Sequence, residues 1–146
     1  MQAEEMWELF LKENQLENQE YEAWAFGAQP DQLAELVVQG IKTATASAYD
    51  LYEIEHEPLP KVGEYSVILD SKDKAKCIIQ TTKVYVVPFE EVSTSHAYKE
   101  GEGDRSLAYW REVHEAVFTE WLLEAGLDFS RSRKVVCEEF KVVYTE

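Results

Sequence analysis

The segment Gly40–Ser47 is the first part of the sequence in which residue types and spacing could do chemistry. A lysine follows the glycine, and the residues after it are small or carry hydroxyl groups. Small side chains leave room for a pocket, and burial lowers the pKa of a lysine, which would make Lys42 a base near neutral pH. A threonine hydroxyl becomes a nucleophile when a base takes its proton. The segment therefore predicts a reactive pair of Lys42 and Thr45.

The alternation of side chains along a strand sets a condition on this pair. In a regular strand Lys42 would point to the same side as Ala44, whereas Thr45 would point to the other. The two side chains meet only if the chain is still turning or bulged at Lys42. Otherwise the segment is a surface lysine followed by an ordinary threonine-rich strand, and that alternative stays open here.

A second candidate is the segment Glu100–Arg105, in which three carboxylates alternate with glycines just before a predicted helix. Crowded carboxylates raise one another's pKa, which suits a general acid, and glycines let the backbone approach a ligand closely. The alternative is a capping loop, because Asp104 alone is a good cap for the helix. The calcium-loop pattern of an EF-hand is absent.

Aromatic side chains provide candidate binding groups. Trp24 and Phe26 stand next to Gly27 and outside a regular helix, so they are candidates for stacking on a planar heterocycle. Trp110 and His114 have helical spacing and are more typical of a core. The three histidines and two cysteines lack the spacing of metal ligands, so we predict neither a metal nor a cofactor.

Composition and charge limit the classes of partner. The chain has 146 residues, and 45% of them are hydrophobic, which predicts one packed domain. Its net charge of -15 would repel long polyanions. Binding of DNA is therefore not expected, and no apolar run reaches the roughly 18 residues of a membrane span. Cys77 and Cys137 form no CxxC pair and the N-terminus does not resemble a signal peptide, which predicts a reduced, cytoplasmic chain.

The elements that must position these residues follow from periodicity and turn residues. Helices are predicted over 3–14, 30–40 and 107–126, with a short helix and loop over 89–99. Strands are predicted over 43–47, 65–69, 75–87 and 134–144, and an extended segment over 21–27. Neighbouring strands joined by short turns favour an antiparallel sheet, which can close into a small barrel. The predicted fold class is α+β.

Taken together, six segments resemble the ASCH-domain family. They are Trp24–Gly27, Gly40–Ser47, Pro60–Tyr65, Val87–Val92, Glu100–Asp104 and Trp110–His114. The resemblance covers roughly residues 20–145 and implies a PUA-like β-barrel with helices packed around it. It also implies an N-terminal helical extension over residues 1–19, added to an ASCH domain over residues 20–146. Because the fold is shared with RNA-modification domains, the resemblance implies a role connected with RNA or nucleosides.

Some small bacterial members of that family are amidohydrolases that remove the acetyl group of N4-acetylcytidine. Their catalytic set is a lysine, a threonine three residues later and a downstream glutamate, which the resemblance carries over to Lys42, Thr45 and Glu100. This chain is longer than those enzymes and has two more carboxylates in the loop, Glu102 and Asp104. The choice of catalytic glutamate therefore stays open between Glu100 and Glu102.

The first hypothesis is thus an amidohydrolase acting on a small acetylated nucleoside. Lys42 would activate Thr45 or a water, and Glu100 would protonate the departing amine. The predicted substrate-binding residues are Trp24, Phe26, Ser47, Glu102, Asp104 and Arg105.

The alternatives are a module that binds single-stranded RNA or a modified nucleotide without catalysis, a ribonuclease, and a regulatory domain whose acidic first helix docks a basic partner. An RNA-binding rim would use two basic clusters, at Lys72–Lys76 and Arg131–Lys134. The sequence leaves the oligomeric state open.

Overall fold

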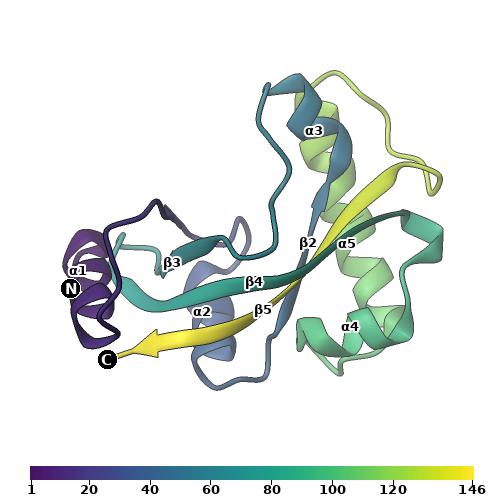
Figure 1. Cartoon of the computed structure of the whole chain (residues 1–146). Coiled ribbons are helices and arrows are strands. Elements are labelled where there is room, and N and C mark those ends of the chain that lie inside the picture. Colours follow the sequence, from purple (N-terminus) through teal and green to yellow (C-terminus); the bar gives the residue numbers. More distant parts are fainter.

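The computed structural model describes residues 1–146 and is built on one five-stranded sheet, curled into half a barrel (Figure 1). The strands lie in the order β1-β3-β4-β5-β2. Their bounds are β1 Glu22–Trp24, β2 Ala44–Ala48, β3 Tyr65–Leu69, β4 Ala75–Pro88 and β5 Lys134–Thr145. All neighbours are antiparallel except β1 and β3, which run parallel. The α+β prediction is confirmed, but the sheet is mixed, because a long crossover connects β1 to β3.

Five α-helices surround the sheet. They are α1 Ala3–Glu13, α2 Pro30–Val38, α3 Tyr49–Ile54, α4 Thr94–Glu100 and α5 Leu107–Glu124, and a 3-10 turn spans Phe89–Glu91. The predicted helices and strands are present within a few residues of their expected bounds. Helix α3 was not predicted, because it has only six residues and none of them is buried, so it leaves no apolar stripe in the sequence.

Helix α1 packs on the sheet at the end where β3 and β4 meet (Figure 1). Its buried residues Met6, Trp7 and Phe10 contact a cluster that includes Val67 and Ile78. The Ala75 amide also donates a hydrogen bond to the Met1 carbonyl, at 2.9 Å. The division of the chain after residue 19 remains a prediction, and α1 shares its apolar contacts with the sheet.

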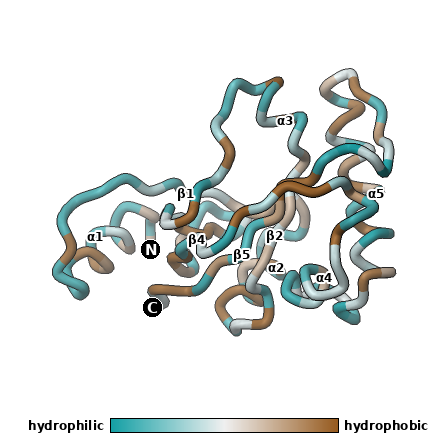
Figure 2. The backbone as a smooth tube through the Cα atoms, turned by 45° about the vertical axis from the view of Figure 1, so that its right-hand side comes forward, coloured by the Kyte–Doolittle hydropathy of each residue, from teal (hydrophilic) through white to brown (hydrophobic).

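Two further apolar clusters hold the helices that frame the site. Helix α2 buries one face against β3, β4 and β5, and α5 buries its own face together with α4 and the opposite ends of β4 and β5. Figure 2 shows apolar residues gathered in the strands at the centre, with mostly hydrophilic connecting segments around them. Helices α2 and α5 are therefore both fixed to the sheet by apolar packing, and the site lies between them.

Cys77 and Cys137 are buried in these clusters as free thiols. Burial raises the pKa of each thiol to about 12, so both are unreactive at neutral pH. Among the helices, none has both the length and the apolar character that crossing a membrane would need.

Candidate functional site

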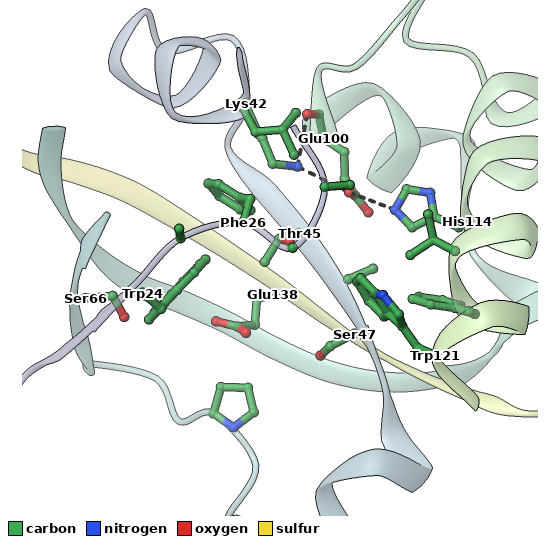
Figure 3. A pocket seen from close by; sticks show the side chains of 18 of the residues that line it. Trp24, Phe26, Lys42, Thr45, Ser47, Ser66, Glu100, His114, Trp121 and Glu138 are labelled. Atoms are coloured by element: carbon green, nitrogen blue, oxygen red, sulfur yellow. Dashed lines mark hydrogen bonds and ion pairs between the residues drawn. The ribbon is translucent and has the colours of Figure 1, made fainter. Parts of the chain in front are cut away.

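A cleft of about 630 Å³ opens between β2, β5, helix α5 and the segments around β1 and β3 (Figure 3). Its size falls in the usual range for small-molecule sites, which is roughly 300–1,000 Å³. Seven of the predicted site residues line it: Trp24, Phe26, Lys42, Thr45, Ser47, Glu100 and Glu102. The structure thus brings together residues that lie as many as 78 positions apart in the chain.

Lys42 lies in the turn between α2 and β2, not in the strand. Its amide and that of Ile41 both donate to the Leu36 carbonyl, at 3.1 and 3.0 Å, and β2 begins only at Ala44. The alternation of a strand therefore does not apply at Lys42, and both Lys42 and Thr45 face the cleft. The sequence required the chain to be still turning at Lys42 if that side chain was to share a side with Thr45, and the structure has this turn. The lysine is only 1% exposed.

Two carboxylates hold the Lys42 ammonium: that of Glu100, the last residue of α4 (Figure 3), and that of Glu102 in the loop that follows. Its Nζ lies 3.3 Å from Glu100 Oε1 and 2.9 Å from Glu102 Oε2. The lysine that the sequence predicted as a buried base therefore lies in a buried ion pair with two carboxylates.

Glu100 is the centre of a buried hydrogen-bond network. Its Oε2 accepts from His96 Nε2 at 2.7 Å and from Trp110 Nε1 at 2.5 Å, while Oε1 faces Lys42 and, at 3.4 Å, His114 Nε2. Burial opposes ionisation, but Lys42 and the two histidines hold the pKa of Glu100 well below its usual range. The expectation that crowded carboxylates raise this pKa is wrong here, because cationic and N–H donors surround the group.

His114 lies at the edge of the same network and lines the cleft, where the sequence favoured a core position. Its ring stacks on Trp110 with centroids 4.2 Å apart, and Nδ1 lies 2.8 Å from the Trp110 carbonyl. Its two ring nitrogens thus face a carbonyl and, at 3.4 Å, the Glu100 carboxylate. Burial lowers the pKa of His114, but its contacts with Glu100 outweigh this effect and the net pKa is raised.

Glu102 differs from Glu100 in its surroundings. Its side chain is 18% exposed, against 2% for Glu100, and its one hydrogen bond is the one from Lys42. The Glu100 carboxylate accepts three hydrogen bonds and contacts His114, so moving it would leave buried donors unpaired. Of the two carboxylates between which the sequence could not choose, Glu102 is therefore the more exposed one and has the fewer contacts.

Asp104 and Arg105 lie outside the cleft, so the structure does not support their prediction as substrate-binding residues. Asp104 is exposed and accepts from the Ser106 amide at 2.9 Å, beside the N-cap of α5. The Arg105 guanidinium lies 3.7 Å over the Tyr98 ring and donates to the Tyr98 and Ile41 carbonyls. Arg105 holds the loop against the chain instead of reaching a ligand.

The aromatic and hydroxyl groups predicted to bind a ligand form one wall of the cleft. Trp24 and Phe26 pack edge to face with centroids 5.0 Å apart, and Lys42 Nζ lies 5.3 Å from the centre of the Phe26 ring. Ser47 Oγ is 2.7 Å from the hydroxyl of Tyr52, which α3 contributes. The lining of the cleft therefore includes two aromatic rings and a hydroxyl pair.

Glu138 is a cleft residue that the sequence analysis missed as a site residue. It lies in β5 directly opposite Thr45 of β2, and its Oε2 accepts from Thr81 Oγ1 at 3.3 Å. Burial raises the pKa of Glu138 to about 7 against the opposing effect of the Thr81 hydrogen bond, and the charges of Glu64 and Glu22 add to the rise. The signal in the sequence was a glutamate that alternates with the apolar residues Val136 and Phe140 of β5.

The lining of the cleft is strongly acidic. Six carboxylates lie on it, with Lys42 and His114 as its cationic groups: Glu22, Glu57, Glu64, Glu100, Glu102 and Glu138. Glu100, Glu102 and His114 offer ligand atoms within 4.8 Å of one another, a spacing at which a metal ion could be held. The Lys42 ammonium already bridges the two carboxylates.

Comparisons with known proteins agree with this architecture. The family model described as the ASCH domain matches residues 22–144. A solved ASCH domain from Lactobacillus crispatus JV V101 is 33% identical, with a TM-score of 0.87 over 96% of this chain and 95% of that one. A solved protein from Enterococcus faecalis V583 is 40% identical, with a TM-score of 0.89 over 97% of this chain and 87% of that one. Among curated proteins no match was found.

Proposed function

This chain belongs to the ASCH domain family, with its PUA-like α+β fold, and from that premise we propose that its cleft hydrolyses the acyl amide of a small, uncharged nucleoside of the N4-acetylcytidine type. One observation carries the proposal. The Thr45 hydroxyl lines the same cleft as the buried Lys42, whose ammonium contacts the partly exposed carboxylate of Glu102. These are the parts that nucleophilic amide hydrolysis needs.

In the proposed reaction the Thr45 hydroxyl attacks the acyl carbonyl. Its proton passes to Lys42 Nζ while Lys42 gives one of its own protons to Glu102, 2.9 Å away. The C–N bond breaks, the leaving base takes a proton from an acid group of the cleft, and the acyl group stays on Thr45 as an ester. Water then attacks the ester and returns a proton to that acid group, while the Lys42–Glu102 pair reprotonates Thr45.

Glu100 has a different role in this proposal from the general acid suggested by the resemblance. Its carboxylate accepts three hydrogen bonds and contacts His114, so it acts as a positioning residue that fixes Lys42 and the two histidines. Trp24 and Phe26 flank the planar base.

The charge of the cleft supports a nucleoside over a polymer. A phosphate entering this lining would face six carboxylates with few cations to pair with. The two basic clusters do not form one rim, because they lie at opposite ends of the β4–β5 pair. Arg131 and Arg133 are also engaged, with Glu115 and Asp50. RNA binding and ribonuclease activity therefore rank below amide hydrolysis.

The proposal is tested with purified protein and N4-acetylcytidine, following release of cytidine by chromatography. Thr45→Val removes the hydroxyl with little change of shape and should lower kcat by at least about 100-fold, whereas Thr45→Ser should keep part of the activity. Thr43→Val is the matched control, since the Thr43 hydroxyl donates to the Lys99 carbonyl and does not line the cleft.

Two results would overturn the proposal: a wild-type protein that does not release cytidine, or a Thr45→Val variant as active as wild type. We also propose a cytoplasmic location, in keeping with the two free thiols.

A further inference from the structure

Glu138 is a carboxyl group in the cleft that the proposed reaction has not yet used (Figure 3). No lysine, arginine or histidine lies within ion-pair distance of it, and its one hydrogen bond comes from the neutral Thr81 hydroxyl. The lysines nearby serve the next residue instead, because Lys83 and Lys99 both pair with Glu139. A half-buried carboxyl without a counter-ion, opening into a ligand-sized cavity, is suited to a ligand.

We propose that Glu138, in its protonated form, binds the edge of the substrate base and gives its proton to the ring nitrogen as the amide bond breaks. The inference rests on the proposed function and names the group that recognises the leaving base. A carboxylic acid offers one donor and one acceptor side by side. That pair matches a cytosine edge, where ring nitrogen N3 accepts and the acylated exocyclic N–H donates.

The position of Glu138 opposite the nucleophile supports this role. Thr45 and Glu138 are direct cross-strand partners of β2 and β5, and such pairs have Cβ atoms about 4.5–5.5 Å apart. A base that bonds Glu138 through N3 and the exocyclic N–H carries its acyl group on that same exocyclic nitrogen. The acyl carbonyl is thereby brought beside the Thr45 hydroxyl.

The proton balance closes with Glu138 included. When the C–N bond breaks, its electron pair moves into the ring and N3 takes the Glu138 proton, so the base leaves as its neutral imino tautomer. Glu138 is then a carboxylate at the place the base has vacated. It accepts a proton from the water that attacks the Thr45 ester, while the Lys42–Glu102 pair reprotonates Thr45.

The surroundings of Glu138 keep it protonated at slightly acid pH. Glu22 comes from β1, and Glu57 and Glu64 come from the segment between α3 and β3; Tyr52 of α3 and Thr81 of β4 complete the group. Burial and the neighbouring carboxylates raise the pKa of Glu138 to about 7. The acid form is present below that value and is lost as pH rises through it, so kcat/KM should fall over the same range.

The test compares Glu138→Gln with Glu139→Gln in steady-state hydrolysis of N4-acetylcytidine from pH 5.5 to 8.5. A glutamine keeps a donor and an acceptor but transfers no proton, so Glu138→Gln should leave KM within about threefold and lower kcat at least about 30-fold. In the Glu138→Gln variant, kcat/KM should no longer decrease as pH rises through about 7. In the Glu139→Gln variant, kcat/KM should still decrease over that range. Equal kcat and an unchanged pH profile in Glu138→Gln would overturn the inference while leaving the proposed function intact.

Substrate analogues separate the two proposals further. N4-acetyl-3-deazacytidine lacks the ring nitrogen, so the wild type should hydrolyse it slowly and Glu138→Gln should be no slower; a further large loss would contradict the inference. Binding of the product cytidine, measured by calorimetry, does not depend on turnover. We expect the wild type to bind cytidine more tightly at pH 6 than at pH 8, and Glu138→Gln to bind it equally at both. This result would support binding of the base by Glu138 even if the protein does not hydrolyse N4-acetylcytidine. Binding that is equal at both pH values in the wild type would overturn the role of Glu138.

Discussion

At the scale of single residues, the site depends on one buried carboxylate. Glu100 accepts hydrogen bonds from Lys42, His96 and Trp110 and lies 3.4 Å from His114 Nε2. These partners come from three places in the chain: the segment before β2, α4 and α5. Removing water from these groups is costly, and only the full set of contacts compensates for it. The network therefore holds Lys42 at a defined place beside Glu102.

The two glutamates should respond differently to loss of charge. Glu100→Gln leaves buried cations without their partner and should lower the free energy of unfolding by about 3 kcal/mol, along with activity. Glu102→Gln should cost less than about 1 kcal/mol, because its side chain is more exposed, yet lower kcat about 100-fold. Urea unfolding and hydrolysis of N4-acetylcytidine measure the two effects; a Glu102→Gln variant of full activity would contradict the proposed proton transfer.

His114 should make stability depend on pH. Its pKa in the folded state is raised by Glu100, so its stabilising effect is full below the unfolded value of about 6.5 and is lost as pH rises through the folded value. His114→Gln should therefore reduce the free energy of unfolding more at pH 6 than at pH 8.5. Urea titrations at the two pH values measure this difference. The exposed His56, changed to Gln, is the control and should show the same effect at both.

At the scale of elements, the acidic loop is positioned by its close contact with the chain before β2. Gly101 ends α4 in a left-handed conformation, with φ of 72°, and a Cβ there would lie 2.6 Å from the Ile41 carbonyl oxygen. The Thr43 amide also donates to the Lys99 carbonyl at 2.7 Å. These contacts set the distance between the loop carboxylates and Lys42.

Gly101→Ala should therefore damage both the fold and the site. The added methyl group meets backbone, so the loop must move away from Ile41 and carry Glu100 and Glu102 with it. Gly126→Ala is the matched control, because Gly126 also has a positive φ, of 81°, but open space around its Cβ position. It should cost only the conformational strain, about 1 kcal/mol. Thermal unfolding and activity of both variants test this, and equal losses in the two would contradict the contact argument.

At the scale of the whole molecule, the negative charge is concentrated where a ligand must enter. The net charge is -15, and six of the 29 acidic side chains line the cleft. The basic clusters flank the two ends of β4, whose 14 residues span roughly 40 Å at about 3 Å per residue. No single face therefore offers a polyanion a continuous basic track.

The charge predicts selection against phosphate. The 5′-monophosphate of N4-acetylcytidine should bind more weakly than the nucleoside at low salt, and the difference should shrink as ionic strength rises and screens the repulsion. Calorimetry at 20 and 300 mM sodium chloride measures both. Tighter binding of the monophosphate would instead favour the nucleotide-binding alternative.

The sequence by itself was enough to predict the elements and the candidate reactive residues. Periodicity and turn residues placed four of the five α-helices and all five strands, because each of those elements leaves a local pattern; α3 leaves none. The motif around Lys42 and Thr45 and the glycine-spaced acids were visible for the same reason. The family could be recognised from these local segments together.

Only the tertiary structure decided the partners of those residues. The two carboxylates that pair with the buried Lys42 lie 58 and 60 positions further along the chain. Asp104 and Arg105 stand in the right motif, yet the turn after Gly103 directs them away from the cleft, whereas Glu138 has no motif and is brought opposite Thr45 by strand pairing. Local sequence patterns predict secondary structure because it depends on neighbouring residues in the chain. The electrostatic surroundings of a side chain depend on all residues near it in space, and only the tertiary structure shows which residues those are.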